Sequence, residues 1–173
     1  MNITLIGMSG AGKSTIGKQL AKKLDHKFID IDDLIRGKIG TDLQTFIDAY
    51  GDDEFIELEE QIVIGLHALD NYVIATGGSI VYSEKSIKHL KEISTIVYLD
   101  VSFSQIARRI SPSKRGLVGF KDKGLKDLYH ERKKLYERYL DVRIKIKKGE
   151  KKGDIIDRII VSCSHDGSTS GSV

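Results

Sequence analysis

The feature that most constrains this fold is the glycine-rich segment at residues 7–15, which reads GMSGAGKST. It follows a short apolar run at residues 3–6 and precedes a segment with apolar residues at helical spacing. A strand, a glycine-rich turn and a helix in this order form a loop whose backbone N–H groups surround phosphate oxygens. The positive end of the helix dipole then points at the anion. The segment therefore predicts a phosphate-binding loop.

This loop also suggests roles for single residues. Lys13 can reach the β and γ phosphates of a nucleotide, and Ser14 can ligate Mg²⁺. The alternative is a chance match, since the pattern fixes only four positions, but the flanking strand and helix patterns argue against it. The candidate nucleotide-binding residues of the loop are Gly10, Ala11, Gly12, Lys13, Ser14 and Thr15.

Apolar runs and helical patterns alternate along the whole chain, which indicates an α/β fold with a mostly parallel sheet. We expect strands at residues 2–6, 27–30, 72–75, 95–99 and 142–146. The last of these alternates apolar and basic residues, which is typical of an edge strand with one face in water. Long helices are expected near residues 53–69 and 126–139. Capping boxes starting at Thr41 and Ser102 predict two further helix starts, and Gly51 suits a helix end.

Length and composition favour one domain, which we place at residues 1–162, followed by a disordered tail at residues 163–173. The 28 basic and 25 acidic residues nearly balance and form no basic cluster, so we expect no nucleic-acid partner. Cys163 is the only cysteine, which excludes an internal disulfide. No apolar run approaches the ~20 residues that span a bilayer, and no secretory leader pattern is present. We therefore expect a cytoplasmic monomer that does not contact membranes.

Polar and glycine residues follow the predicted strands, where ligands of α/β sheets bind. Asp30 and Asp32, two residues apart in an extended segment, should project from one face. One carboxylate can hold Mg²⁺, and the other can orient or deprotonate an attacking hydroxyl. The alternative, compatible with both roles, is that Asp32 or Asp33 caps the next helix. Gly77 and Gly78, beyond the third strand, allow close approach of backbone to a ligand, or form a plain tight turn.

Residues 111–125 contain the only proline, three glycines and several charges between two predicted helices. We interpret this segment as a lid that closes over the site, with an ordinary solvated loop as the alternative. Arg115 within it can stabilise the charge of a phosphoryl group in transfer.

Taken in order, these motifs resemble the shikimate kinase family over about residues 1–160. The resemblance rests on the phosphate loop, the Asp30-x-Asp32 pair, Gly77-Gly78, Lys114-Arg115 in the lid, and the segment ERKKLY at residues 131–136. It implies a three-layer P-loop kinase fold with a five-stranded parallel sheet, helices on both faces and a lid. It also implies transfer of the γ-phosphate of ATP, with Mg²⁺, to the 3-hydroxyl of the small hydroxylated acceptor shikimate.

The resemblance further implies site residues. Lys13, Asp32 and Arg115 would act in catalysis, and Ser14 and Asp30 would serve the metal. Arg109 would lie against adenine. The residues implied to bind the substrate are Asp32, Gly77, Gly78 and Arg132.

Four positions depart from the family pattern, and two of them, Gly116 and Lys134, stand where a proline is typical. Ile56 stands where family members usually carry an arginine that grips the shikimate carboxylate, and Ser79 replaces a third glycine. Either another cation supplies the missing contact, or the substrate is a different sugar acid, polyol or hydroxy amino acid. A hypothesis from a different functional class is that the protein is a nucleotide-binding regulatory module without phosphotransfer. The alternative cations are Arg36, Lys38, Lys133 and Lys134.

Overall fold

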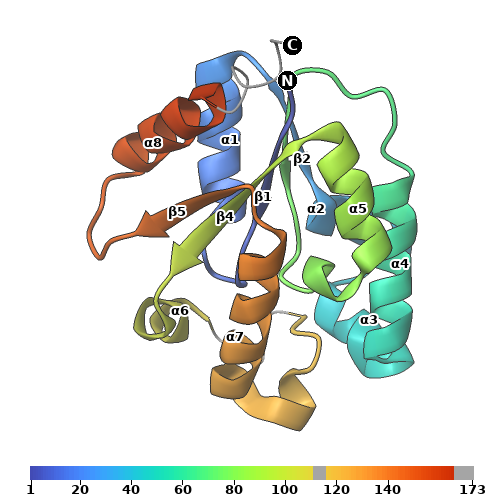
Figure 1. The fold of residues 1–173 in the computed structure, drawn as a ribbon. Coiled ribbons are helices and arrows are strands. Elements are labelled where there is room, and N and C mark those ends of the chain that lie inside the picture. The colour runs from blue at the N-terminus through green and yellow to red at the C-terminus, as the bar shows by residue number, and fades with distance from the viewer. Residues whose placement is uncertain (111–115, 166–173) are drawn as a thin grey trace.

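The computed structural model of this protein describes residues 1–110 and 116–165. Five strands form one parallel sheet in the order β2–β3–β1–β4–β5 (Figure 1). In the register of this sheet, Leu5 of the central strand lies between Ala75 and Val97. The strands are β1 Ile3–Ile6, β2 Lys27–Asp30, β3 Tyr72–Ala75, β4 Thr95–Val101 and β5 Val142–Ile146.

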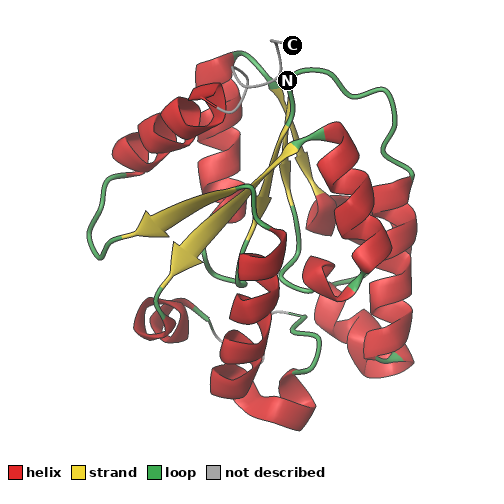
Figure 2. Ribbon diagram, in the orientation of Figure 1, coloured by secondary structure: helices red, strands yellow, loops and turns green. Residues whose placement is uncertain are grey.

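Helices cover both faces of the sheet, which gives three layers (Figure 2). Helices α1 and α8 pack together on one face, whereas α4, α5 and α7 lie on the other. The predicted α/β fold class is confirmed. The helices are α1 Lys13–Leu24, α2 Ile31–Ile39, α3 Leu43–Tyr50, α4 Asp52–Ile64, the 3-10 helix η1 Ile80–Tyr82, α5 Glu84–Ile93, α6 Phe103–Arg109, α7 Phe120–Tyr139 and α8 Lys152–His165.

Burial along the strands explains why their sequences differ in pattern. All four residues of β1 are buried, as expected for a central parallel strand covered on both faces. In β5, buried Val142, Ile144 and Ile146 alternate with exposed Arg143 and Lys145. β5 pairs only with β4 within the described sheet, so the predicted edge strand with one wet face is confirmed.

Two predicted helix boundaries are wrong. Helix α4 ends at Ile64 instead of residue 69, and Ala68 and Asn71 beyond it adopt left-handed backbone angles that a helix cannot contain. Helix α7 begins at Phe120 instead of residue 126, with one break at Gly124, whose φ is 71°. Of the predicted lid at residues 111–125, residues 120–125 are therefore mostly helical, residues 116–119 form a loop, and residues 111–115 lie outside the described residues.

The helix starts also differ from their predicted caps. Asp42, not Thr41, caps α3, and its Oδ1 accepts a hydrogen bond from the Thr45 N–H at 2.9 Å. Ser102 does begin α6, but its side chain makes no cap hydrogen bond. Gly51 ends α3 as predicted. Asp42 follows Thr41 by one position and competes with it for the cap of α3, since aspartate and threonine side chains both accept hydrogen bonds from the first helical turn.

Residues 163–165, which we assigned to the expected disordered tail, are helical. Helix α8 continues to His165, and Cys163 is 3 % exposed on the same buried face as Ile156 and Ile159. Apolar residues at helical spacing extend α8 into the small polar residues that had suggested a tail. Residues 166–173 lie outside the described residues. No helix in the described part of the chain combines the length and apolarity needed to cross a membrane.

Candidate active site

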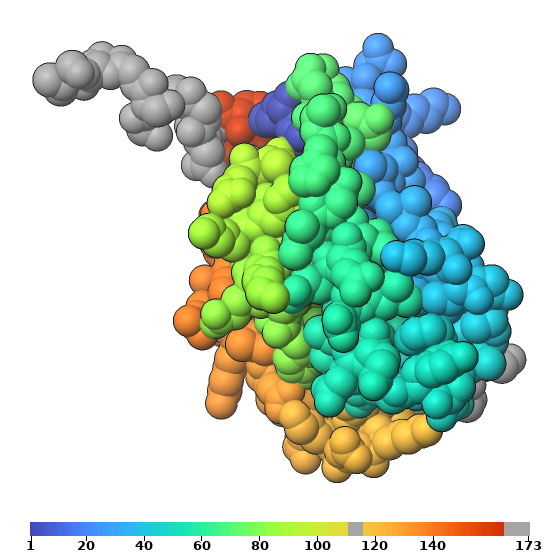
Figure 3. All heavy atoms as spheres, turned by 90° about the vertical axis from the view of Figure 1, so that its right-hand side faces the viewer, coloured from blue at the N-terminus to red at the C-terminus, as the bar shows by residue number. Residues whose placement is uncertain are grey.

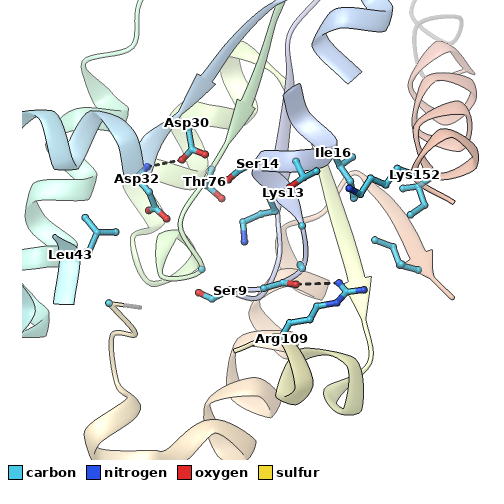
Figure 4. Close-up of a pocket in the computed structure, with 18 of the residues that line it drawn as sticks. Ser9, Lys13, Ser14, Ile16, Asp30, Asp32, Leu43, Thr76, Arg109 and Lys152 are labelled. Carbon is cyan, nitrogen blue, oxygen red and sulfur yellow. Dashed lines mark hydrogen bonds between the residues drawn. The ribbon is translucent and has the colours of Figure 1, made fainter. Parts of the chain in front are cut away.

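A cavity of about 910 Å³ lies at the carboxyl ends of the strands. The phosphate loop forms its floor, the starts of α2 and α3 form one wall, and the connection from β5 to α8 forms the opposite wall. Figure 4 shows Asp32 and Leu43 on the first wall, Lys13 and Ser14 in the centre, and Ile16 and Lys152 toward the second wall. The cavity therefore has two ends, one at α2 and α3 and the other at the connection from β5 to α8, at which different ligands can bind.

The phosphate loop adopts a conformation that requires glycine at two of its turns. Gly7 has φ of 142° and Gly12 has φ of 96°, values that other residues rarely adopt. A Cβ on Gly7 would also lie 2.9 Å from the Leu99 carbonyl oxygen. Helix α1 starts at Lys13, so its free N–H groups face the cavity. The predicted loop residues all line the cavity, namely Gly10, Ala11, Gly12, Lys13, Ser14 and Thr15.

Lys13 is the buried cation of the loop. Its Nζ donates to the carbonyl oxygens of Gly7 at 2.6 Å and Met8 at 3.0 Å, and its side chain is almost fully buried. Burial lowers the pKa of Lys13 to about 8, while the carboxylate of Asp32 acts in the opposite direction. A negatively charged phosphate in the cavity would offset this cost of burial and favour the charged ammonium.

The two predicted carboxylates both line the cavity, but they reach it from different elements. Asp30 ends β2, and its Oδ1 accepts a hydrogen bond from the Asp32 N–H at 3.1 Å, so that Asp30 caps α2. Asp32 lies in the first turn of α2, and the prediction of one extended segment is wrong for it. Burial raises the pKa of Asp32, and the nearby Lys13 ammonium partly opposes the shift. A carboxylate made more basic beside a buried cation is suited to accept a proton.

Two side chains that line the cavity carry oxygen atoms suited to a small divalent cation. Ser14 and Asp30 both line the cavity, and hydroxyl and carboxylate oxygens are ligands that Mg²⁺ accepts. Within residues 1–110 and 116–165, no group of three or more His, Cys, Asp or Glu side chains could hold a metal on its own. A cation here would take its remaining ligands from water and from a bound phosphate.

Gly77 and Gly78 are needed for close packing against ionisable side chains. A Cβ on Gly77 would lie 2.5 Å from Glu59 Oε1 and 3.0 Å from Asp32 Oδ1. A Cβ on Gly78 would lie 2.6 Å from Arg132 Nη1. Gly78 lines the cavity, whereas Gly77 lies behind its wall.

Arg132 on α7 is 1 % exposed and stands behind Gly78 instead of on the cavity wall. Its Nη2 donates to the Val118 carbonyl oxygen at 2.8 Å, and its Nε donates to the Tyr82 hydroxyl at 3.4 Å. The guanidinium carbon lies 5.3 Å from the centre of the Tyr82 ring, which adds a cation–π contact. These contacts fix the guanidinium, with Nη1 directed toward Gly78.

Glu59 on α4 is the most deeply buried acid near the cavity, at 1 % exposed. Its Oε2 accepts a hydrogen bond from the Ser79 hydroxyl at 2.7 Å, and its Oε1 has no hydrogen-bond partner. Burial raises the pKa of Glu59 to about 7. Ser79, which departs from the family pattern, therefore supplies the one hydrogen bond that this carboxyl receives from the described residues.

The structure describes one of the two arginines that we expected at the nucleotide, Arg109, which was predicted to lie against adenine. Arg109 lines the cavity and donates from Nη1 to the Gly10 carbonyl oxygen at 3.2 Å. Arg115, the predicted lid arginine, lies outside the described residues.

The wall formed by Lys147, Gly149 and Lys152 was not predicted. Its position after the carboxyl end of β5 is the signal that could have found it.

Among the four alternative cations, Arg36 alone lines this cavity within the described residues. Lys38 lines a separate groove between α2, α3 and α4. Lys133 lies 3.8 Å from the buried carboxylate of Asp100, and Lys134 is absent from the cavity wall.

A parallel five-stranded sheet, a phosphate loop at its centre and an acid beside the loop lysine define a P-loop kinase. Sequence comparison makes the class specific. The shikimate kinase family model matches residues 9–164. The protein described as shikimate kinase in Francisella tularensis subsp. novicida is 41% identical over 145 residues, which covers 82% of each chain. The Mannheimia succiniciproducens protein of the same description is 38% identical, covering 83% of this chain and 84% of that one. The chain belongs to the shikimate kinase family.

Solved structures agree with this assignment. Shikimate kinase from Acinetobacter baumannii, solved in complex with shikimate, superposes with a TM-score of 0.87 at 27% identity and covers 97% of this chain and 95% of that one. Shikimate kinase from Aquifex aeolicus superposes with a TM-score of 0.82 at 28% identity, covering 97% and 99%.

Proposed function

We propose that this protein transfers the γ-phosphoryl group of ATP to the 3-hydroxyl of shikimate. The observation that carries the proposal is the position of Asp32 beside Lys13 in one cavity, where an acceptor hydroxyl and a donor phosphate can meet. The A. baumannii relative, which is described as binding shikimate, supports the choice of acceptor.

In this proposal the floor and the far wall of the cavity bind ATP. The backbone N–H groups of residues 10–15 surround the β and γ phosphates, and Lys13 neutralises part of their charge. Arg109 lies against the adenine, near the wall formed by Lys147 and Lys152. Ser14 and Asp30 would hold Mg²⁺, which supplies further charge neutralisation at the phosphates when it is bound.

Asp32 receives the acceptor. Its carboxylate accepts a hydrogen bond from the attacking hydroxyl and takes its proton as the new O–P bond forms and the bond to ADP breaks. Gly78 offers its backbone to the substrate, with Gly77 making room for the two acids behind it. Arg132 would pair with the substrate carboxylate, and Arg115 would close onto the phosphoryl group with the lid. Exclusion of water by this closure prevents wasteful hydrolysis of ATP.

The test is ADP release with ATP, Mg²⁺ and shikimate. The wild type should release ADP only when shikimate is present, and Asp32→Asn should lower kcat at least about 100-fold because general-base catalysis contributes this much. The affinity for ATP should stay within about 2-fold, measured by calorimetry. No ADP above background from the wild type would contradict the proposal.

One observation favours a second acceptor class. Ile56 is apolar and does not line the cavity, so α4 brings no cation to the acceptor end. A panel of sugar acids, polyols and hydroxy amino acids would reveal a better acceptor. Higher turnover of one of these compounds, together with a gain toward shikimate in Ile56→Arg, would support that alternative.

A further inference from the structure

The cations of the cavity are unevenly divided between its two ends. Lys13 and Arg109 contact the phosphate loop through the carbonyl oxygens of Gly7, Met8 and Gly10. Lys147 and Lys152 stand on the wall between β5 and α8. Within the described part of the chain, Arg36 is the one cation on the opposite wall, beside Asp32 and Leu43. Among the residues that the structure describes, Arg36 is therefore the single cation on the surface of the acceptor end.

Helical geometry places Arg36 on the same face of α2 as Asp32. Residues four apart in a helix are neighbours on its surface and are separated by about 6 Å along the axis. Both side chains line the same cavity. A small cyclic hydroxy acid can span this separation, with a hydroxyl at Asp32 and its anionic group at Arg36.

Arg36 is also free to take a ligand. Its Nη1 donates to Asp33 Oδ1 at 2.8 Å, but the two side chains are 49% and 61% exposed. Ion pairs at such exposure contribute little to stability, so a ligand can replace Asp33 at low cost. The guanidinium has five N–H donors in a planar fork, so it can bind a carboxylate with two of them and keep or release Asp33.

Arg132 cannot serve alone from its present position. Two of its nitrogens are already hydrogen-bonded to Val118 and Tyr82, and the side chain is 1 % exposed behind Gly78. An acceptor carboxylate that reached only Nη1 would gain one direct hydrogen bond. A second cation on the wall would give it a bidentate partner.

We propose that Arg36 binds the anionic group of the acceptor and so makes this site select hydroxy acids over neutral polyols. The inference deepens the proposed function and rests on its assignment of the acceptor end. Helix α2 then fixes both ends of the acceptor: Asp32 orients the hydroxyl, and Arg36 holds the carboxylate.

The test compares shikimate with its uncharged methyl ester. Arg36→Gln removes the charge and leaves a shorter polar side chain, and Arg36→Lys keeps the charge and loses the fork. Lys38→Gln, on the same helix but outside the cavity, is the matched control. Arg36→Gln should raise KM for shikimate about 10- to 100-fold, as expected for a lost charge-assisted hydrogen bond. KM for the ester and for ATP should change less than about 2-fold, and Arg36→Lys should recover part of the loss.

The inference is overturned if Arg36→Gln leaves KM for shikimate unchanged, or if it raises KM for acid and ester equally. Failure of the proposed function has a different signature, because the wild type itself then shows no turnover of shikimate. If the panel instead yields another hydroxy acid, the same variants are assayed with that acid and its ester. A wild type that phosphorylates only neutral polyols overturns the inference. Without any turnover, calorimetric binding of shikimate decides: equal affinity in wild type and Arg36→Gln overturns it.

Discussion

At the scale of single residues, Glu59 is buried among charges from three other elements. Lys13 on α1, Asp32 on α2 and Arg132 on α7 all act on it, and burial dominates their combined effect, so that the pKa of Glu59 rises to about 7. Ser79 donates the only hydrogen bond that its carboxyl receives within residues 1–110 and 116–165. The protein therefore keeps an acid next to the cavity that holds its proton to near neutral pH.

This raised pKa predicts a pH dependence of stability. Between pH 4.5 and about 7 the unfolded chain has released the Glu59 proton while the folded protein retains it, so the free energy of unfolding falls as pH rises. At about 1.4 kcal/mol per pH unit, the loss reaches about 3 kcal/mol above pH 7. Glu59→Gln should therefore gain stability relative to the wild type as pH rises through this range.

Urea unfolding at several pH values measures this difference. Exposed Glu57 on the same helix provides the control, and Glu57→Gln should show no comparable slope. A stability difference between wild type and Glu59→Gln that stays constant from pH 4.5 to 7.5 would contradict the assignment.

At the scale of elements, α1 packs against β2 through Gly17. A Cβ on Gly17 would lie 2.6 Å from Phe28 Cε2 and 3.4 Å from Leu5 Cδ1. Gly17→Ala should therefore lower the free energy of unfolding by about 1–3 kcal/mol through overpacking. Gly37 on α2 has nothing within 4 Å of the same position. Gly37→Ala should be neutral or stabilise by up to about 1 kcal/mol, because alanine favours helix. Equal urea midpoints for the two variants would refute this packing account.

Sequence patterns predicted the elements wherever the information is local. Continuous apolar runs identified the buried strands β1, β3 and β4, alternation identified the edge strand β5, and the phosphate loop followed from its own glycines, whereas β2 lies at the other edge and is only partly buried. Boundaries that depend on competition between neighbouring caps were misplaced, as at Asp42. The setting of Arg132 was beyond prediction, because its partners Tyr82 and Val118 come from different segments and meet only in the folded chain.

At the scale of the whole molecule, the parallel sheet brings distant segments to one edge. The loop after β1, the acids at the end of β2, Gly78 after β3 and the wall after β5 all reach the same cavity because their strands run in one direction. Figure 3 shows the adjoining face, where α4 and α5 cover the sheet and the start of α7 lies below them. The cavity thus lies at one edge of the sheet, beside the packed hydrophobic core.

Residues 116–119, within the predicted lid, connect this cavity to α3 and α4. The Gly119 N–H donates to Asp52 Oδ2 at 2.8 Å, and a Cβ on Gly116 would lie 2.7 Å from Leu43 Cβ. The same segment supplies the Val118 carbonyl oxygen to Arg132. The acceptor end of the cavity is therefore enclosed by elements that are far apart in sequence.

The central claim is that this cavity joins ATP to a hydroxyl of shikimate. Mass spectrometry of a reaction containing the protein, ATP, Mg²⁺ and shikimate tests it directly, with ADP quantified in the same sample. We expect shikimate 3-phosphate and ADP in equal amounts, neither product when EDTA removes the metal, and at least about 100-fold slower formation of both when Asp32→Asn replaces the wild type. ADP formed without a phosphorylated acceptor, or no reaction at all, would contradict the account.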